Sequence, residues 1–80
     1  MKHPNWQTVD LVRAMYPKGT IVSLRKMSDA YAPPVGTLGV VEGVDPCANV
    51  MIRWQNGRHM SVLYGIDRID VVLPARASTR

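Results

Sequence analysis

The stretch NVMIRWQNGRHMSVL, residues 49–63, decides the fold. Apolar residues alternate with polar ones in both halves, which is typical of two β-strands that are each buried on one face. The Asn56-Gly57 pair between the halves is a strong signal for a tight hairpin turn. We therefore predict a hairpin of two strands, residues 49–54 and 58–63, at the centre of the fold.

The register of this hairpin follows from the residues that must share the buried face. A two-residue turn would pair Ile52 with Ser61 and would put the apolar residues of the two strands on opposite faces. A three-residue loop, residues 55–57, pairs Ile52 with Met60 and gathers them on one face. We therefore predict this longer loop, with Gly57 alone in the left-handed bulge conformation. The full set of predicted pairs is Trp54 with Arg58, Arg53 with His59, Ile52 with Met60, Met51 with Ser61, and Val50 with Val62.

A helix and three further strands are expected around the hairpin. Apolar residues recur at helical spacing over residues 5–15, Pro17 ends the pattern, and either Asn5 or Thr8 caps its start. The expected strands are residues 20–27, 37–44 and 68–72, and Gly39 and Gly43 indicate a bend or bulge. The fold class predicted is mainly β, a small five-stranded SH3-like barrel with one N-terminal α-helix.

The chain is expected to form one domain with short extensions. Its parts are predicted as an N-terminal helical segment packed on the barrel (1–16), the SH3-like barrel (17–73) and a basic C-terminal tail (74–80). Two interpretations of the helix remain open. It covers an open end of the barrel, or it binds a partner through Trp6.

Composition places this chain in a reducing, aqueous compartment. Cys47 is its single cysteine, so an internal disulfide is impossible. No run of about 18 apolar residues exists, and residues 1–6 lack the apolar region of a secretory signal. We therefore expect a cytoplasmic protein without a membrane partner.

The formal net charge of +4 overstates how basic the body of the chain is. Lys2, Arg76 and Arg80 lie near the chain ends, where no acidic residue occurs. Residues 10–72 contain seven basic and six acidic residues, a net charge of +1. The electrostatic argument for a nucleic-acid partner is therefore weaker than the total suggests.

Several short motifs resemble a family of small proteins. They are YPKGT (16–20), LRKM (24–27), APPVGTxG (32–39), Val44-Asp45 and WxNG (54–57). Together they resemble a domain of unknown function found in phages, conjugative elements and Gram-positive bacteria, over roughly residues 16–70. The resemblance implies the barrel and a phage or mobile-element origin, and it implies no activity. Small proteins of such elements often bind host machinery, including defence complexes.

No constellation for catalysis, metal binding or cofactor binding is evident in the sequence. Cys47, His3 and His59 lack the spacing of metal ligands, and no residue marks a base for Cys47. The glycines at 36, 39 and 43 match neither a phosphate loop nor a dinucleotide-binding motif. We therefore expect a protein that is not an enzyme and has no cofactor and no metal.

The candidate partner-binding residues are Tyr31, Pro33, Pro34 and Tyr64. An aromatic ring beside a stiff Pro-Pro backbone loses little entropy on binding. The alternative is that Pro33 and Pro34 only brace the mouth of the barrel. A basic strand face is the candidate for nucleic-acid contacts, against the alternative of solvated charges that protect strand edges. Its residues are Arg25, Lys26, Arg53, Arg58 and Arg68, with Arg76 and Arg80 of the tail.

Three hypotheses follow for the function. The first is a non-enzymatic binding module that docks on a host protein or ribonucleoprotein, with a role as a defence inhibitor of the anti-CRISPR kind. The second is direct nucleic-acid binding through the basic face and the tail. The third is a homodimer formed through the helix or through an open strand edge.

Overall fold

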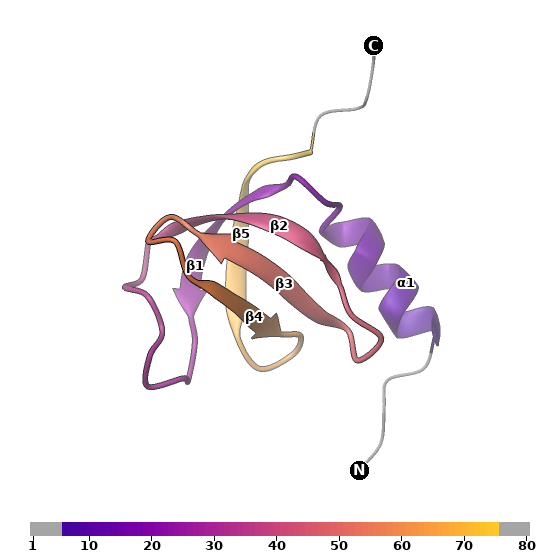
Figure 1. Ribbon diagram of the computed structural model, residues 1–80. Helices are drawn as coiled ribbons and strands as arrows, with labels where there is room; N and C mark the ends of the chain where they lie inside the picture. The colour runs from indigo at the N-terminus through magenta and orange to yellow at the C-terminus, as the bar shows by residue number, and fades with distance from the viewer. Residues whose placement is uncertain (1–5, 76–80) are drawn as a thin grey trace.

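The structure is a computed structural model that describes residues 6–75 (Figure 1). Its helix, α1, comprises Trp6–Met15, and a single sheet of five antiparallel strands follows it. The predicted mainly β class with one N-terminal helix is confirmed, and every strand boundary lies within one residue of its predicted position. The strands are β1 (Ile21–Lys26), β2 (Leu38–Val44), β3 (Asn49–Trp54), β4 (His59–Leu63) and β5 (Arg68–Leu73).

The sheet is open, although the sequence predicted a barrel. Its strand order is β4-β3-β2-β1-β5, so β4 and β5 form its two edges. Figure 1 shows the sheet strongly coiled, with β5 running at a steep angle to β3 and β4. The short turn after β4 directs β5 to β1, with which β5 pairs along its whole length. The backbone hydrogen bonds that would close a barrel between β4 and β5 are therefore not observed.

The β3–β4 hairpin has the predicted register. β3 pairs with β4 through Val50 with Val62, Ile52 with Met60 and Arg53 with His59. The amide of Trp54 donates to the carbonyl of Arg58 at 2.8 Å, which closes the three-residue loop. Gly57 has a φ of 88°. Within the described residues, Ala48 is the one non-glycine residue with a positive φ, so Asn56 does not have one. The prediction of a left-handed Gly57 preceded by an ordinary Asn56 is confirmed.

The two glycines of β2 have different physical roles. The pairing of β2 with β3 shifts between Val41 and Gly43, so a bulge lies there as predicted. Gly39 pairs with Trp54, and a Cβ added to Gly39 would lie 2.7 Å from the Trp54 ring and 2.5 Å from Ile52. Gly39 therefore makes room for the Trp54 ring.

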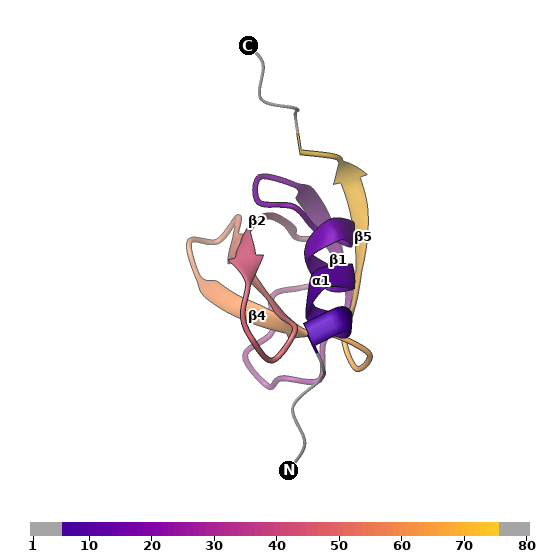
Figure 2. The ribbon, with the colours of Figure 1, turned by 90° about the vertical axis from the view of Figure 1, so that its right-hand side faces the viewer.

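The core joins the helix to the inner face of the sheet. Val9 and Val12 of α1 are buried in the same cluster as the strand residues. The Arg13 guanidinium also donates to the carbonyl of Val44 at 3.2 Å, which ties α1 to the end of β2. Figure 2 views the molecule from the side on which α1 lies. The buried strand residues are Val22, Leu24, Val41, Val44, Val50, Ile52, Trp54 and Val62.

Parts of two predictions fall on residues that the structure does not describe. Asn5, one of the two candidate helix caps, precedes the described residues, and most of the predicted basic tail follows them. Thr8, the other candidate cap, lies inside α1 rather than before it. The exposed fraction of Trp6 is 71%, so its ring does not contribute to the core.

We predict that Gly39→Ala lowers the free energy of unfolding by about 3 kcal/mol, because the added methyl group would overlap Trp54 and Ile52. Gly57→Ala is the matched control, since a left-handed φ strains alanine there but no atom lies within 4 Å. We expect a loss of about 1 kcal/mol for that control. Urea unfolding measures both values, and a larger loss for Gly57→Ala would contradict the packing role of Gly39.

Candidate functional site

A cleft of about 330 Å³ lies on the open side of the sheet, between β4 and β5. Val50 and Val62, both core residues, form part of its lining, so the cleft reaches the hydrophobic core. Its volume falls within the range of small-ligand pockets. We call it the edge cleft, and its other lining residues are Tyr16, Arg25, Tyr64, Gly65, Asp67, Arg68, Ile69 and Asp70.

A tightly bonded turn fixes one wall of the edge cleft. Asp67 accepts a hydrogen bond from the amide of Leu63 at 3.0 Å and another from the amide of Ser28 at 3.3 Å. The Asp67 amide in turn donates to the carbonyl of Leu63 at 2.9 Å. Gly65 supplies the positive φ of 86° that this turn needs. Hydrogen bonds between Leu63 and Asp67 therefore fix the backbone on both sides of Tyr64, which lines the cleft.

The charged residues of the edge cleft differ in whether they have an ion-pair partner. The Arg25 guanidinium and the Asp70 carboxylate form an ion pair at 3.0 Å. Arg68 pairs in register with Lys26 across β1 and β5, which places two like charges on opposed residues. The Arg68 guanidinium has no hydrogen bond or ion pair with any residue between 6 and 75. The cleft therefore has one cation without a partner in the described structure.

Tyr16 forms the wall of the edge cleft nearest the helix. Its side chain is partly buried against the core, directly after α1. Burial raises the pKa of the Tyr16 hydroxyl above its usual value of 10.0, and the nearby Tyr64 and Asp70 raise that pKa further. The hydroxyl therefore remains a protonated hydrogen-bond donor throughout the physiological pH range.

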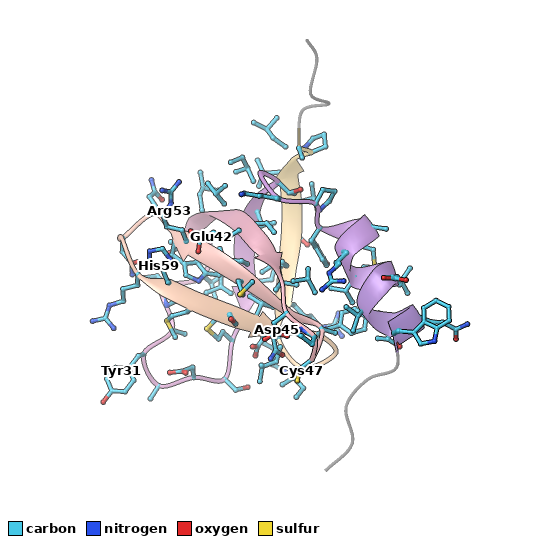
Figure 3. All side chains as sticks on the ribbon, turned by 45° about the vertical axis from the view of Figure 1, so that its right-hand side comes forward. Tyr31, Glu42, Asp45, Cys47, Arg53 and His59 are labelled. Atoms are coloured by element: carbon cyan, nitrogen blue, oxygen red, sulfur yellow. The ribbon has the colours of Figure 1, made fainter. Side chains whose placement is uncertain are left out.

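The structure separates the four predicted partner-binding residues. Tyr64 lines the edge cleft, whereas Tyr31 lies on the loop between β1 and β2 and points away from the sheet (Figure 3). Pro33 is buried, so it braces the loop, while Pro34 is exposed. Tyr31, Pro33 and Pro34 therefore form no part of the edge cleft that Tyr64 lines.

The predicted basic residues also fall into separate groups. Arg53 and Arg58 belong to the β3–β4 hairpin, whereas Arg25, Lys26 and Arg68 lie on β1 and β5. Strand β2 lies between β3 and β1 in the sheet and contains Glu42 and no basic residue. The described residues therefore provide no continuous basic stripe, and Arg76 and Arg80 lie outside them.

The outer face of the sheet brings His59 and Glu42 together. Their side chains lie 2.9 Å apart, beside Arg53, and both are solvent-exposed (Figure 3). Cys47 lies exposed in the β2–β3 turn, next to Asp45, whose carboxylate accepts the Cys47 amide at 2.9 Å. Within residues 6–75, no three His, Cys, Asp or Glu side chains lie close enough to bind a metal ion. No helix within this range is long and apolar enough to cross a bilayer.

Sequence reasoning missed most of the edge cleft. The sequence placed Tyr16 only at the end of the N-terminal helical segment and in the YPKGT motif, and Ile69 and Asp70 only in a strand. Their one sequence signal was the combination of tyrosine, arginine and aspartate near the ends of the elements. That combination is common on protein surfaces, and it indicates a site only when the elements meet in space.

We predict that the protein loses stability as the pH rises above about 10, in part through Tyr16. Because the pKa of Tyr16 is raised, the folded state holds the hydroxyl proton more tightly than the unfolded state does. This contribution to the free energy of unfolding is complete at a pH below the pKa of Tyr16 in the unfolded chain, and it is lost as the pH rises and Tyr16 ionises in the folded protein. Tyr16→Phe should therefore show a smaller fall in unfolding free energy between about pH 9 and pH 11.5. Tyr31→Phe is the control, and equal profiles for the two variants would refute the assignment.

We predict that labelled single-stranded DNA and RNA bind weakly, because the basic residues are divided by β2. Removal of residues 76–80 should abolish most of the binding seen at about 50 mM salt. A fluorescence anisotropy titration against salt measures this. A steep salt dependence that survives the truncation, and falls in Arg53→Gln, would instead support a nucleic-acid face.

The comparisons with known proteins identify a family without a known activity. Neither the curated proteins nor the solved structures gave a match. A family model, described as a domain of unknown function, matches residues 5–72. This range includes α1, all strands to within one residue of the end of β5, and every lining residue of the edge cleft. The chain therefore belongs to the domain family DUF4314.

Proposed function

We propose that this protein is a non-enzymatic binding module that docks on a host protein or ribonucleoprotein through the edge cleft. The observation that supports this proposal best is the opening between β4 and β5, where a cleft reaches Val50 and Val62 of the core. Concave sites with an apolar floor and a few polar groups are the usual form of binding sites.

The walls of the edge cleft favour tight recognition. Tyr16 and Tyr64 provide large apolar surfaces with a hydroxyl at one end, and tyrosine is enriched among residues that dominate binding energy. The turn around Tyr64 is fixed by the Asp67 hydrogen bonds. This surface is therefore ordered before a partner binds, so binding would cost little conformational entropy.

The β1–β2 loop offers a second contact surface. Asp29 accepts the amide of Tyr31 at 2.7 Å, and the Thr37 hydroxyl donates to the carbonyl of Pro34 at 2.6 Å. These bonds and the buried Pro33 hold the loop, while the exposed fraction of Tyr31 is 74%. An exposed aromatic ring on a braced loop suits a peripheral contact with a protein partner.

The biological setting is a finer proposal, supported by the family resemblance of the sequence motifs. In this proposal the protein is encoded by a phage or mobile element, acts in the host cytoplasm and inhibits a defence complex in the manner of an anti-CRISPR protein. Inhibition by docking requires no catalytic group. It requires a stable binding surface, which the edge cleft can supply.

We predict that Tyr64→Ser reduces capture of the partner about tenfold, since loss of a central aromatic contact commonly costs about 1–2 kcal/mol. The experiment captures partners from host extract with the immobilised protein and quantifies each by mass spectrometry. Arg58→Gln is the control, because Arg58 lies on the β3–β4 loop, away from the cleft. Tyr31→Ser shows whether the β1–β2 loop takes part.

Equal capture by Tyr64→Ser and by the unmodified protein would contradict docking through the edge cleft. Light scattering of the purified protein provides the complementary measurement. A dimer that dissociates when β4 or β5 is altered would favour the homodimer hypothesis instead.

A further inference from the structure

Three of the four carboxylate oxygens of the edge cleft already accept a hydrogen bond from the described residues. One Asp70 oxygen accepts from Arg25 at 3.0 Å. Each Asp67 oxygen accepts a backbone amide, from Ser28 and from Leu63. One Asp70 oxygen is therefore the carboxylate acceptor of the cleft that has no partner among the described residues.

Three donor side chains of the edge cleft have no partner among residues 6–75, whereas Arg25 is paired with Asp70. The guanidinium of Arg68 and the hydroxyls of Tyr16 and Tyr64 make no hydrogen bond to residues 6–75. The raised pKa of Tyr16 keeps its hydroxyl protonated. A ligand in this cleft therefore meets unused donors and few unused acceptors, which favours an anionic or strongly accepting group.

The backbone register adds an electrostatic reason for an anion. Lys26 and Arg68 are opposed across β1 and β5, and like charges at such positions repel. Neither side chain forms an ion pair within the described residues. An anionic group beside Arg68 would offset this repulsion, so the cleft is complementary to negative charge at this end.

The floor of the edge cleft sets a second requirement. Val50 and Val62 line the bottom of the cleft but are almost fully buried, so the accessible aliphatic surface next to the tyrosine rings is that of Ile69. Asp67 and Asp70 stand at the same cleft and would repel a polyanion with a charge on every unit. A peptide meets both requirements, because it can combine one carboxylate with a neighbouring apolar side chain.

We propose that the edge cleft binds a peptide segment of the partner that places an aspartate or glutamate carboxylate at Arg68 and an adjacent aliphatic or aromatic side chain against Ile69 and the two tyrosine rings. This inference rests on the proposed binding function and specifies the chemistry of its partner. The carboxylate accepts hydrogen bonds from Arg68 and from the tyrosine hydroxyls, and the apolar side chain leaves water.

The test titrates the ¹⁵N-labelled full chain with three peptides of equal length and follows the backbone amide signals. The peptides alternate leucine with glutamate, with glutamine or with lysine between Gly-Ser ends. We expect the Leu/Glu peptide to shift the amides of residues 64–70 in a saturable manner. The Leu/Gln peptide should bind about fivefold more weakly and the Leu/Lys peptide more weakly still.

Two arginine variants locate the charge preference. Arg68→Gln should reduce the preference for Leu/Glu over Leu/Gln to nearly equal binding, whereas Arg58→Gln removes the same charge elsewhere and should leave it unchanged. Arg25→Gln releases the Asp70 carboxylate and should move the preference toward the Leu/Lys peptide. Thermal unfolding of each variant confirms that the fold is retained.

The outcomes separate this inference from the function on which it rests. Equal binding of Leu/Gln and Leu/Glu peptides at residues 64–70 would overturn the carboxylate requirement and leave docking through the cleft intact. Shifts at residues 64–70 with an oligonucleotide but with none of the peptides would overturn the inference in favour of nucleic acid. Absence of any shift there, together with unchanged partner capture by Tyr64→Ser, would overturn both proposals.

Discussion

The contact between Trp54 and Gly39 is the constraint on which the rest of the structure depends. The Trp54 ring occupies the space that a Cβ at position 39 would fill, and its indole nitrogen donates to the carbonyl of Met60 at 3.1 Å. One side chain thus joins β2, β3 and β4. Because the exposed fraction of Trp54 is only 1%, a slip of β3 by one residue would expose this ring and leave its polar nitrogen without that partner. The three-residue loop ending at Gly57 follows from this register.

The open side of the sheet is a consequence of the same packing. With β2 and β3 held at the centre, β4 and β5 become the edges, and β5 is engaged by β1. The turn between them is held by Asp67, so the edges diverge and leave a cleft that reaches Val50 and Val62. The accessible apolar surface of this cleft is that of Ile69, Tyr16 and Tyr64, because Val50 and Val62 are almost fully buried. Binding a partner there would remove this apolar surface from water.

Prediction from the sequence succeeded for elements governed by short-range rules and failed for the cleft. The alternation around Asn56-Gly57 gave the strands and the register, because side-chain direction in a strand has a period of two. The sequence predicted less about the loop between β1 and β2, because no local rule distinguishes the buried Pro33 from the exposed Pro34. Three of the four candidate partner-binding residues, Tyr31, Pro33 and Pro34, come from one loop, and only Tyr64 lines the observed cleft. The observed cleft combines Tyr16 with residues 64–70, which only the coiling of the sheet brings together.

By itself, the sequence determined the helix, the five strands, the hairpin register and the nearly neutral character of the chain body, because each depends on periodicity, turn chemistry or composition. Only the tertiary structure decided which edges remain open, that β2 divides the basic residues, and that Arg68 stands opposite Lys26 without a carboxylate partner. These features depend on strand order and on the angle between strands, which arise from packing over long sequence separations. The hairpin of residues 49–63 therefore determined the register of β3 and β4, while the coiling of the whole sheet created the candidate binding site.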